Sequence, residues 1–309
     1  MGGQSTYDPD SPTIEILELT DKEIKFTLDN CDLSVANALR RIMIAEVPTM
    51  AVDKVLMTQN KSVLFDEFIT HRLGLVPLRS EGVHQYKYVR ECSCPSSCEQ
   101  CSFTFQLDVK ARDEPLAVTT KDLQSHTAST SHNDVRPVSP RDSELTDPNL
   151  YDTSVLLARL VPDQELKLQG FAQKGIGKLH AKWSPVTSVK LQHEPDILIN
   201  HIKMAELTEE EKKGFVKSCP TGVYSFENQR VEIKDIMNCT FCNECFYYAE
   251  EEIKKKQLVT IQEKPNRFTI TVETTGALPP ERVVTDALQV LLNKLTEVRQ
   301  ASEIATRGH

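Results

Sequence analysis

The stretch Leu33-Ser-Val-Ala-Asn-Ala-Leu-Arg-Arg-Ile-Met-Ile-Ala-Glu-Val-Pro-Thr-Met-Ala51 is the most informative part of the chain for its fold. Ser34 is a suitable N-cap, and the residues that follow it favour a helix. Pro48 prevents that helix from continuing. We therefore predict a helix that begins at Ser34 and runs through Val47.

Alternating apolar and polar residues predict strands on both sides of this helix. Ile14-Glu15-Ile16 and Ile24-Lys25-Phe26-Thr27-Leu28 alternate around Thr20-Asp21-Lys22, which indicates a hairpin. Further strands are predicted at 155–160, 165–168 and 268–272.

After Pro279-Pro280 the sequence predicts its clearest helix. Apolar residues recur there at spacings of three and four, as in a coiled-coil seam held for about two heptads. They are Val284, Leu288, Leu291, Leu295 and Val298. Such a seam fits an ordinary core, and it also fits pairing with a second chain.

The composition indicates a protein with substantial cores and no membrane span. Its 309 residues are 39% hydrophobic, enough for two domains. No apolar run approaches the roughly 20 residues that cross a bilayer. The net charge of −9 argues against independent nucleic-acid binding, which needs a basic surface. Nine cysteines without a signal sequence predict a reducing compartment with metal ligands and no disulfide framework.

The run C-S-C-P-S-S-C-E-Q-C places four cysteines on one short loop: Cys92, Cys94, Cys98 and Cys101. Four thiolates can close a tetrahedron around Zn²⁺ and leave no position open for water, so such a site is structural. The residues between them form turns and have no apolar reason for burial. Two local disulfides are the alternative, but they need an oxidising compartment. We predict one structural zinc ion.

A second cysteine set has the spacing Cys239-x2-Cys242-x2-Cys245, with Cys219-Pro220 upstream. It matches the ligands of one cluster in a two-cluster ferredoxin. Three interpretations stay open: a [4Fe–4S] cluster, zinc on the same sulfurs, or thiols of a ferredoxin-like module that folds without metal. The cluster is the less favoured, because spacing alone does not show that the loops converge. We interpret Cys31 as a small buried apolar residue.

No catalytic constellation is found. Gly170-Phe-Ala-Gln-Lys-Gly175 begins like a phosphate loop, but Ile176 stands where the lysine must be, so we predict a glycine-rich turn. His180, His193 and His201 are spread too widely for a metal signature, and we predict that they are structural or surface residues.

Two polar segments predict solvated structure. The segment Lys121–Asn149 is predicted to be a long solvated loop, with His126 and His132 as exposed side chains. Glutamates at 250–252 each stand four residues before lysines at 254–256, which predicts a solvated helical face.

The stretch 33–51 resembles the assembly helix of the alpha-like subunits of RNA polymerases. Two later segments support the resemblance: His71-Arg-Leu-Gly-Leu-Val-Pro-Leu78 and Gly177-Lys-Leu-His-Ala-Lys-Trp-Ser-Pro185. With the last helix they extend it over most of the chain. The loop at 92–101 is similar to that of the RNA polymerase II branch; the archaeal branch typically lacks it, and the branch shared by polymerases I and III is a weaker match. The second cysteine set is fuller than the polymerase II branch is expected to need, which favours an archaeal-like alternative slightly.

The resemblance implies an α+β fold like the N-terminal domain of the polymerase alpha subunit. Residues 1–48 and 258–309 would form a discontinuous dimerisation domain. Residues 49–185 would form an inserted mixed domain with the zinc loop, and 186–257 a return segment with a small ferredoxin-like insert.

The resemblance also implies partners. The smaller alpha-like subunit would bind a seam on the first and last helices, for which we select Leu39, Ile42, Met43, Leu288, Leu291, Leu292 and Leu295. The pair would then assemble with the two large catalytic subunits and with small zinc-containing subunits, and Arg40-Arg41 would face a large subunit.

The leading hypothesis is therefore a non-catalytic scaffold of RNA polymerase II, located in the nucleus, without direct nucleic-acid or membrane binding. A single-cluster iron–sulfur redox or redox-sensing protein is the alternative from another class. A free zinc module that binds DNA or a protein by itself is the third, and the net acidity disfavours its DNA version.

Overall fold

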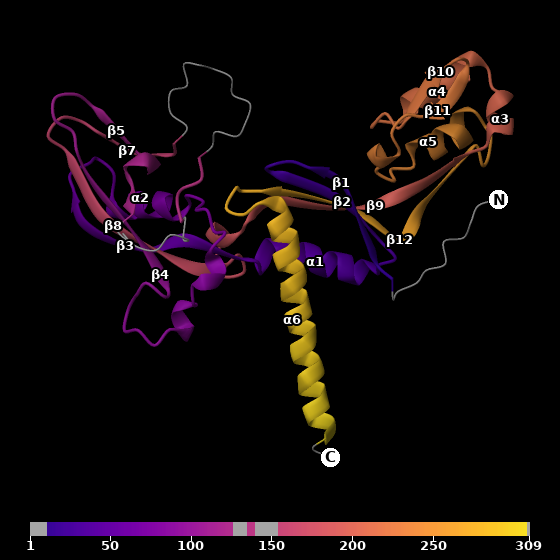
Figure 1. The fold of residues 1–309 in the computed structure, drawn as a ribbon. Coiled ribbons are helices and arrows are strands. Elements are labelled where there is room, and N and C mark those ends of the chain that lie inside the picture. Colours follow the sequence, from indigo (N-terminus) through magenta and orange to yellow (C-terminus); the bar gives the residue numbers. More distant parts are fainter. Residues whose placement is uncertain (1–10, 126–134, 140–153, 308–309) are drawn as a thin grey trace. The chain divides into compact units, whose positions relative to one another are not determined.

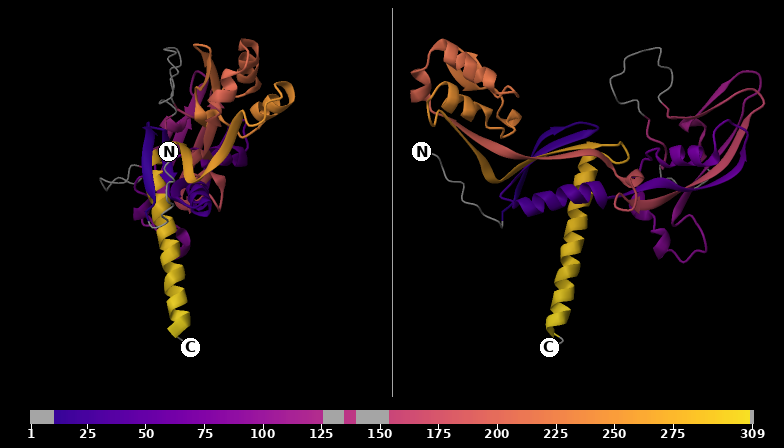
Figure 2. Two further views of the ribbon diagram at one scale, coloured as in Figure 1. Left: turned by 90° about the vertical axis from the view of Figure 1, so that its right-hand side faces the viewer. Right: turned by 180° about the vertical axis from the view of Figure 1, so that it is seen from behind.

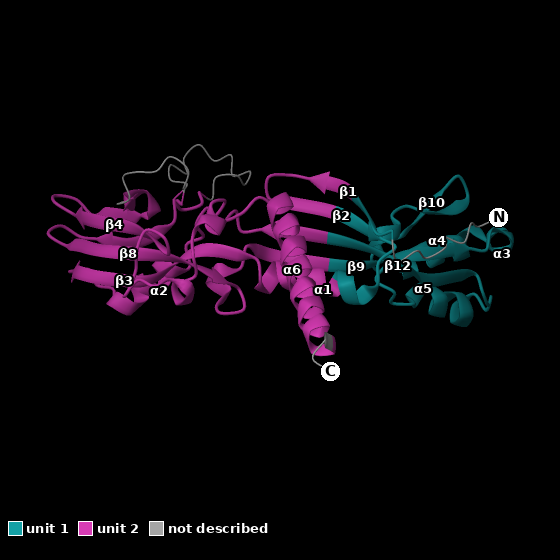
Figure 3. Ribbon diagram, turned by 60° about the horizontal axis from the view of Figure 1, so that its bottom comes forward, with its two compact units in different colours: residues 1–15, 26–36, 191–270 teal, residues 16–25, 37–190, 271–309 magenta. Residues whose placement is uncertain are grey.

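The computed structural model describes residues 11–125, 135–139 and 154–307, and the fold is α+β (Figure 1). The chain divides into two compact units (Figure 3). Unit 1 comprises the described parts of 1–15, 26–36 and 191–270, and unit 2 comprises 16–25, 37–190 and 271–309. Each unit has its own hydrophobic core, and each is described by itself below.

The predicted hairpin is confirmed. Strands β1 (Thr13–Leu19) and β2 (Glu23–Asp29) are neighbours, and the turn between them is closed by Thr20, whose hydroxyl accepts the Glu23 N–H at 3.0 Å. The four-stranded sheet has the order β1-β2-β12-β9, with β9 at Val186–Ile199 and β12 at Val259–Thr274. The strand predicted at 268–272 lies within β12 and is also confirmed.

The predicted first helix is confirmed as α1 (Leu33–Ala45), but its N-cap is Asp32 and not Ser34. The Asp32 carboxylate accepts the Ser34 N–H at 2.7 Å, and hydrogen bonds from the Ser34 hydroxyl and from this N–H lower the pKa of Asp32. This carboxylate, two residues earlier than the predicted cap, satisfies one free N–H group of the first turn and interacts favourably with the positive end of the helix dipole. Cys31, just before the cap, is buried against Leu28 and Phe268, as predicted.

In unit 2 the main sheet is antiparallel and has the order β3-β8-β4-β6. Its strands are β3 (Pro48–Asn60), β8 (Glu165–Ile176), β4 (Ser102–Lys110) and β6 (Gln124–Ser125). A two-stranded sheet of β5 (Leu116–Thr119) and β7 (Leu156–Leu160) and the helix α2 (Asp66–Gly74) complete this part of the unit. Its core is formed by side chains such as Ile69, Leu73, Phe105 and Leu168, each at most 2% exposed.

The long solvated loop predicted for Lys121–Asn149 is partly wrong. Residues 120–122 form a 3₁₀ turn, η3, which continues into β6, and Val135 is buried in the core of unit 2. Pro137 forms a bridge with Leu78. Polar composition misled the prediction, because short apolar anchors such as Val135 hold such a segment to the core. His126 and His132 lie outside the described residues.

The glycine-rich turn predicted at Gly170–Gly175 is wrong, because both glycines lie inside strand β8. A Cβ on Gly175 would lie 2.3 Å from the ring of Trp183, which is itself buried. The Trp183 ring N–H donates to the Gln173 carbonyl at 3.0 Å. The glycine therefore makes room for an indole packed directly on the strand.

Unit 1 contains a small compact core around Phe215, Val223, Val231 and Cys245. Its elements beyond the long strands are α3 (His201–Ala205), α4 (Glu209–Ser218), the hairpin β10 (Tyr224–Glu227) and β11 (Arg230–Ile233), the turn η6 (Ile236–Asn238), α5 (Glu244–Tyr247) and the π-helical turn η7 (Tyr248–Glu252). Helix α4 begins with a capping box: the Thr208 hydroxyl accepts the Glu211 N–H, and the Glu211 carboxylate accepts the Thr208 N–H at 2.7 Å.

The solvated helical face predicted for 250–256 is wrong. The helix ends after η7, and Lys254 adopts a left-handed conformation with φ of 57°. Lys255 pairs with Glu206, near the start of α4, and not with Glu251. The bent chain therefore replaces the pairs along a helix with a tertiary ion pair.

The C-terminal helix α6 (Pro280–Arg307) is long, and only its first turns are covered by unit 2. Val283, Val284 and Ala287 are buried, whereas described residues after Leu291 are exposed except the half-buried Thr296. Figure 2 shows the helix extending from the sheet in both further views. No described helix is both long and apolar enough to span a bilayer.

A buried carboxylate fixes the start of α6. Asp286 is 8% exposed, and its two oxygens contact the Nε2 of His84 at 3.1 Å and the Nε of Arg282 at 3.0 Å. His84 lies on the turn η1 (Val83–Gln85). About two turns later along the helix, Lys294 contacts both carboxylate oxygens of Glu46 at 2.8 and 2.9 Å. These contacts fix the direction of the exposed part of α6 relative to the rest of unit 2.

We expect Gly175→Ala to destabilise the chain by about 1–3 kcal/mol, because the added methyl group overlaps the Trp183 ring. Urea unfolding followed by tryptophan fluorescence measures this change. Gly170→Ala is the matched control on the same strand: its Cβ would lie 3.4 Å from Leu73 and Val52, in ordinary contact, so it should cost less. Equal stability of the two variants would contradict the proposed role of Gly175.

Candidate metal centre and docking helix

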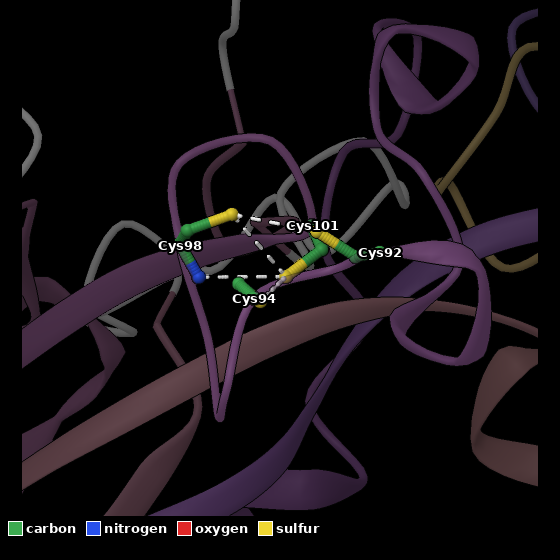
Figure 4. Close-up of side chains that lie close together, drawn as sticks. All are labelled: Cys92, Cys94, Cys98 and Cys101. Atoms are coloured by element: carbon green, nitrogen blue, oxygen red, sulfur yellow. Dashed lines mark hydrogen bonds between the residues drawn. The ribbon is translucent and has the colours of Figure 1, made fainter.

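The four cysteines of the first set converge on one point, as Figure 4 shows. Their sulfur atoms all lie within 4.8 Å of one another. The Sγ atoms of Cys92 and Cys98 are 3.6 Å apart, as are those of Cys94 and Cys101, and Cys98 and Cys101 are separated by 3.8 Å. Four sulfurs bound to zinc at about 2.3 Å lie about 3.8 Å apart along the edges of a tetrahedron. The cluster can therefore hold a metal ion, and its geometry is compatible with zinc.

The thiols of this loop differ in their pKa values. The Cys94 N–H and the neighbouring thiols lower the pKa of Cys92 to about 7. Hydrogen bonds with Cys92 and Cys101 raise the pKa of Cys94 to about 12, and burial raises that of Cys101. Metal binding requires thiolates, so an entering cation must displace protons from Cys94 and Cys101.

The metal loop is fixed to the core of unit 2 at both ends. On one side Cys101 is fully buried and leads directly into β4, and the Cys98 carbonyl accepts the Ser102 N–H at 2.9 Å. On the other side Lys87 N–H donates to the Gln100 carbonyl at 2.8 Å. The ring of Tyr88 is covered by Lys174, whose ammonium lies 4.8 Å from the ring centroid. These contacts hold both ends of the loop against the core of unit 2.

The second cysteine set lies together, but more loosely. Cys219, Cys239, Cys242 and Cys245 line one cavity of about 10 Å³, room for about one water molecule. Within residues 11–125, 135–139 and 154–307, the four ligand atoms of the first set lie close enough together to share one ion, and those of the second set do not meet that condition. The fit to a single zinc ion is therefore poorer than at the first set. The three interpretations of this set, a [4Fe–4S] cluster, zinc or thiols without metal, stay predictions.

Tyr224 also lines this cavity, although no sequence pattern indicated it. Its hydroxyl donates to the Cys245 sulfur at 3.6 Å, and burial raises the tyrosine pKa well above its usual range. Burial also raises the pKa of Cys239 and Cys245. At Cys219, burial is outweighed by hydrogen bonds from the Thr221 hydroxyl and the Val223 N–H, so the pKa is lowered.

The predicted docking seam divides into a buried and an exposed part. Leu39, Ile42 and Met43 on α1 are at most 4% exposed, so they support the helix from within the chain and do not offer a surface to a partner. On α6, Leu288, Leu292 and Leu295 are 38%, 57% and 60% exposed, and Leu291 is half-buried. Together with Val298, these residues lie within about 120° of the helix surface at 3.6 residues per turn. The apolar stripe of α6 is defined here as Leu288, Leu291, Leu292, Leu295 and Val298.

A second exposed apolar surface lies at the start of α2 and was not found from the sequence. Val63 and Phe65 are 79% and 80% exposed, and Phe68 is 51% exposed. The loop that presents them is held by Asn60, whose amide donates to the Leu64 carbonyl at 2.8 Å and accepts the Ser62 N–H at 3.0 Å. We call Val63, Phe65 and Phe68 the α2 patch.

The histidines singled out in the sequence lie apart from both cysteine sets. His180 caps the turn η5 (Ala181–Trp183) by accepting the Lys182 N–H at 3.0 Å. His193 packs edge-on against Phe268, with ring centroids 5.1 Å apart. His201 is exposed at the start of α3. The structure agrees with the predicted structural and surface roles.

Comparison with known proteins defines the class. The family model of the RNA polymerase Rpb3/Rpb11 dimerisation domain matches residues 25–295. The chain therefore belongs to this family of RNA polymerase subunits.

Individual relatives match along nearly the whole chain. It is 44% identical over 293 residues to DNA-directed RNA polymerase II subunit rpb3 of Dictyostelium discoideum, covering 93% of this chain and 94% of that protein. It is 41% identical over 305 residues to subunit 3 of DNA-directed RNA polymerases II, IV and V of Arabidopsis thaliana, covering 94% and 92%. The archaeal subunit Rpo3 of Methanosphaera stadtmanae is 30% identical over 287 residues, covering 92% and 96%.

We expect the purified chain to retain about one zinc ion, and Cys98→Ser to lose it, because three thiolates leave the tetrahedron incomplete. Plasma mass spectrometry of zinc and iron after gel filtration measures this content. Cys242→Ser is the matched control, since Cys242 is exposed and belongs to the second set. Zinc that follows Cys242 in place of Cys98 would reject the assignment, and iron with acid-labile sulfide would identify a cluster in the second set.

Proposed function

We propose that this chain is the Rpb3-type assembly subunit of RNA polymerase II and acts in the nucleus. It pairs with the smaller alpha-like subunit, and the pair provides the platform on which the two large catalytic subunits and small zinc-containing subunits assemble. The role is non-catalytic and involves no direct contact with nucleic acid. The relatives named as polymerase subunits support it, and none supports an iron–sulfur redox protein.

The uncovered apolar stripe of α6 is the observation that carries this proposal. A helix that buries one apolar face usually does so against its own chain, but here the face continues for several turns beyond the core. Large exposed apolar surfaces mark interaction sites. A partner helix packed along the stripe would cover it, and this is the packing that a dimerisation domain requires.

The first cysteine set is proposed to hold one structural zinc ion. When bound, zinc crosslinks a loop that has no apolar core of its own. The residues that hold it leave no open coordination position, which agrees with a scaffold and not with metal catalysis.

The α2 patch is proposed as a contact for one of the large subunits. The patch and the α6 stripe lie on different elements, and α2 packs against β3 and β7 within unit 2. Val63 and Phe65 are presented by a loop that its own hydrogen bonds hold in place, so little entropy would be lost on binding. Glu67 and Asp66 flank the patch, which favours a partner surface with an apolar pocket and a basic rim.

We expect Leu295→Asp to weaken binding of the smaller alpha-like subunit by about 2 kcal/mol or more, roughly 30-fold, because it buries a charge in the seam. Co-expression of the two chains followed by native mass spectrometry measures the heterodimer. Asn293→Asp places the same charge on the opposite side of α6 and should leave the heterodimer intact. Undiminished pairing of the Leu295 variant would count against the stripe as the interface.

For the α2 patch we expect the double variant Val63→Ser/Phe65→Ser to keep the heterodimer but to recover less of the large subunits in tagged purifications, by about tenfold, since aromatic anchors dominate interfaces. Leu179→Ser is the control, because Leu179 is also exposed, at 64%, but lies apart from the patch in sequence. Full recovery of both large subunits with the double variant would remove the patch as their contact.

A further inference from the structure

Unit 1 contains a groove of about 670 Å³ whose role the assembly function does not explain. It lies between α3, α4 and the hairpin of β10 and β11, and its volume is typical of a ligand site. The walls are well fixed. Asn200 caps α3 by accepting the Lys203 N–H at 3.1 Å, and the capping box at Thr208 begins α4. The hairpin turns through Asn228 and Gln229, with φ of 48° and 63°, as in a tight two-residue turn.

More basic than acidic side chains line the groove, and Lys212 also interacts electrostatically with Glu209 outside it. His201, Lys212 and Arg230 line it, against one carboxylate, that of Glu232. Other basic residues nearby are paired: Lys213 contacts Glu209 at 2.6 Å, and Lys255 pairs with Glu206. Within the described ranges, none of the ion pairs found includes Lys212, Arg230 or His201. Unpaired cations that line a concave space favour an anionic ligand.

The chemistry of the groove favours a peptide over a nucleic acid. Ala205 lines it and is exposed, so a small apolar surface lies among the cations. No phenylalanine, tyrosine or tryptophan lines it, so it offers no platform for stacked bases. Residues 191–270 carry 11 Lys and Arg against 14 Asp and Glu, so a long polyanion crossing this unit would meet repulsion outside the groove.

We propose that this groove binds a short acidic segment of a protein partner, in which Asp or Glu side chains alternate with aliphatic residues. The carboxylates pair with Lys212 and Arg230, with His201 as a further donor when protonated, and an aliphatic side chain rests on the exposed Ala205. The site lies in unit 1, whereas the α6 stripe and the α2 patch both belong to unit 2. It would thus recruit a further factor to the assembled subunit, and its failure would leave the assembly role untouched.

The test uses the full chain in its complex with the smaller alpha-like subunit. The probe is a fluorescein-labelled peptide, Asp-Glu-Leu-Asp-Asp-Leu-Glu, titrated at low salt and followed by fluorescence anisotropy. We expect saturable binding that weakens as salt is added, and a loss of at least about tenfold in the double variant Lys212→Glu/Arg230→Glu. The double variant Lys217→Glu/Lys234→Glu makes the same change in net charge outside the groove and should change the affinity less than about twofold.

A variant that binds the probe more tightly shows that changes in affinity do not arise from misfolding. Glu232→Gln removes the carboxylate that lines the groove, and we expect tighter binding of the probe by about two- to fivefold. The proposal is overturned by absence of saturable binding up to about 1 mM peptide, or by equal losses in the two double variants. Tighter binding of an oligouridylate of the same charge than of the peptide would also overturn it, in favour of nucleic acid.

Discussion

The incomplete burial of α6 is the constraint on which the rest of this molecule depends. Its first turns are packed into unit 2, with Val283 and Ala287 fully buried and Asp286 held between Arg282 and His84. Beyond them, most of the apolar stripe is left exposed by the part of the chain that the structure describes. The isolated chain exposes this stripe to water, and the hydrophobic effect favours covering it with another surface. The helix therefore makes the chain a component of an assembly.

Polar contacts fix the orientation of α6. Asp286 satisfies both of its oxygens inside the chain, so it fixes an orientation more than it adds stability. The exposed pair of Lys294 and Glu46 adds little energy but favours the same direction. A helix that is already oriented loses less conformational entropy when a partner binds it. The loop of the first cysteine set is likewise held in place by its own chain, because Cys101 is buried and leads directly into β4.

Much of the fold was predictable because it rests on local signals. The hairpin of β1 and β2, helix α1 and helix α6 follow from periodicity, turn residues and prolines, and the structure confirms all three. The four thiols of the first cysteine set are also a local pattern, since their spacing places them on one loop. The errors have a common cause. Gly175 looked like part of a turn, and the glutamates and lysines at 250–256 looked like a helical face, because their real partners, Trp183 and Glu206, come from other parts of the chain.

The sequence by itself determined the hairpin of β1 and β2, helices α1 and α6, the loop that gathers four thiols and the helix that carries an apolar stripe. These properties depend on residues close together in the chain. Only the tertiary structure decided which apolar residues are core and which are surface. Leu39, Ile42 and Met43 are buried, whereas Leu292 and Leu295, of the same chemical kind, are exposed. Sequence patterns likewise did not indicate that Lys212, Arg230 and His201 line one groove, or that the α2 patch is exposed. The physical reason is that burial and charge pairing depend on contacts between distant segments, which periodicity does not encode.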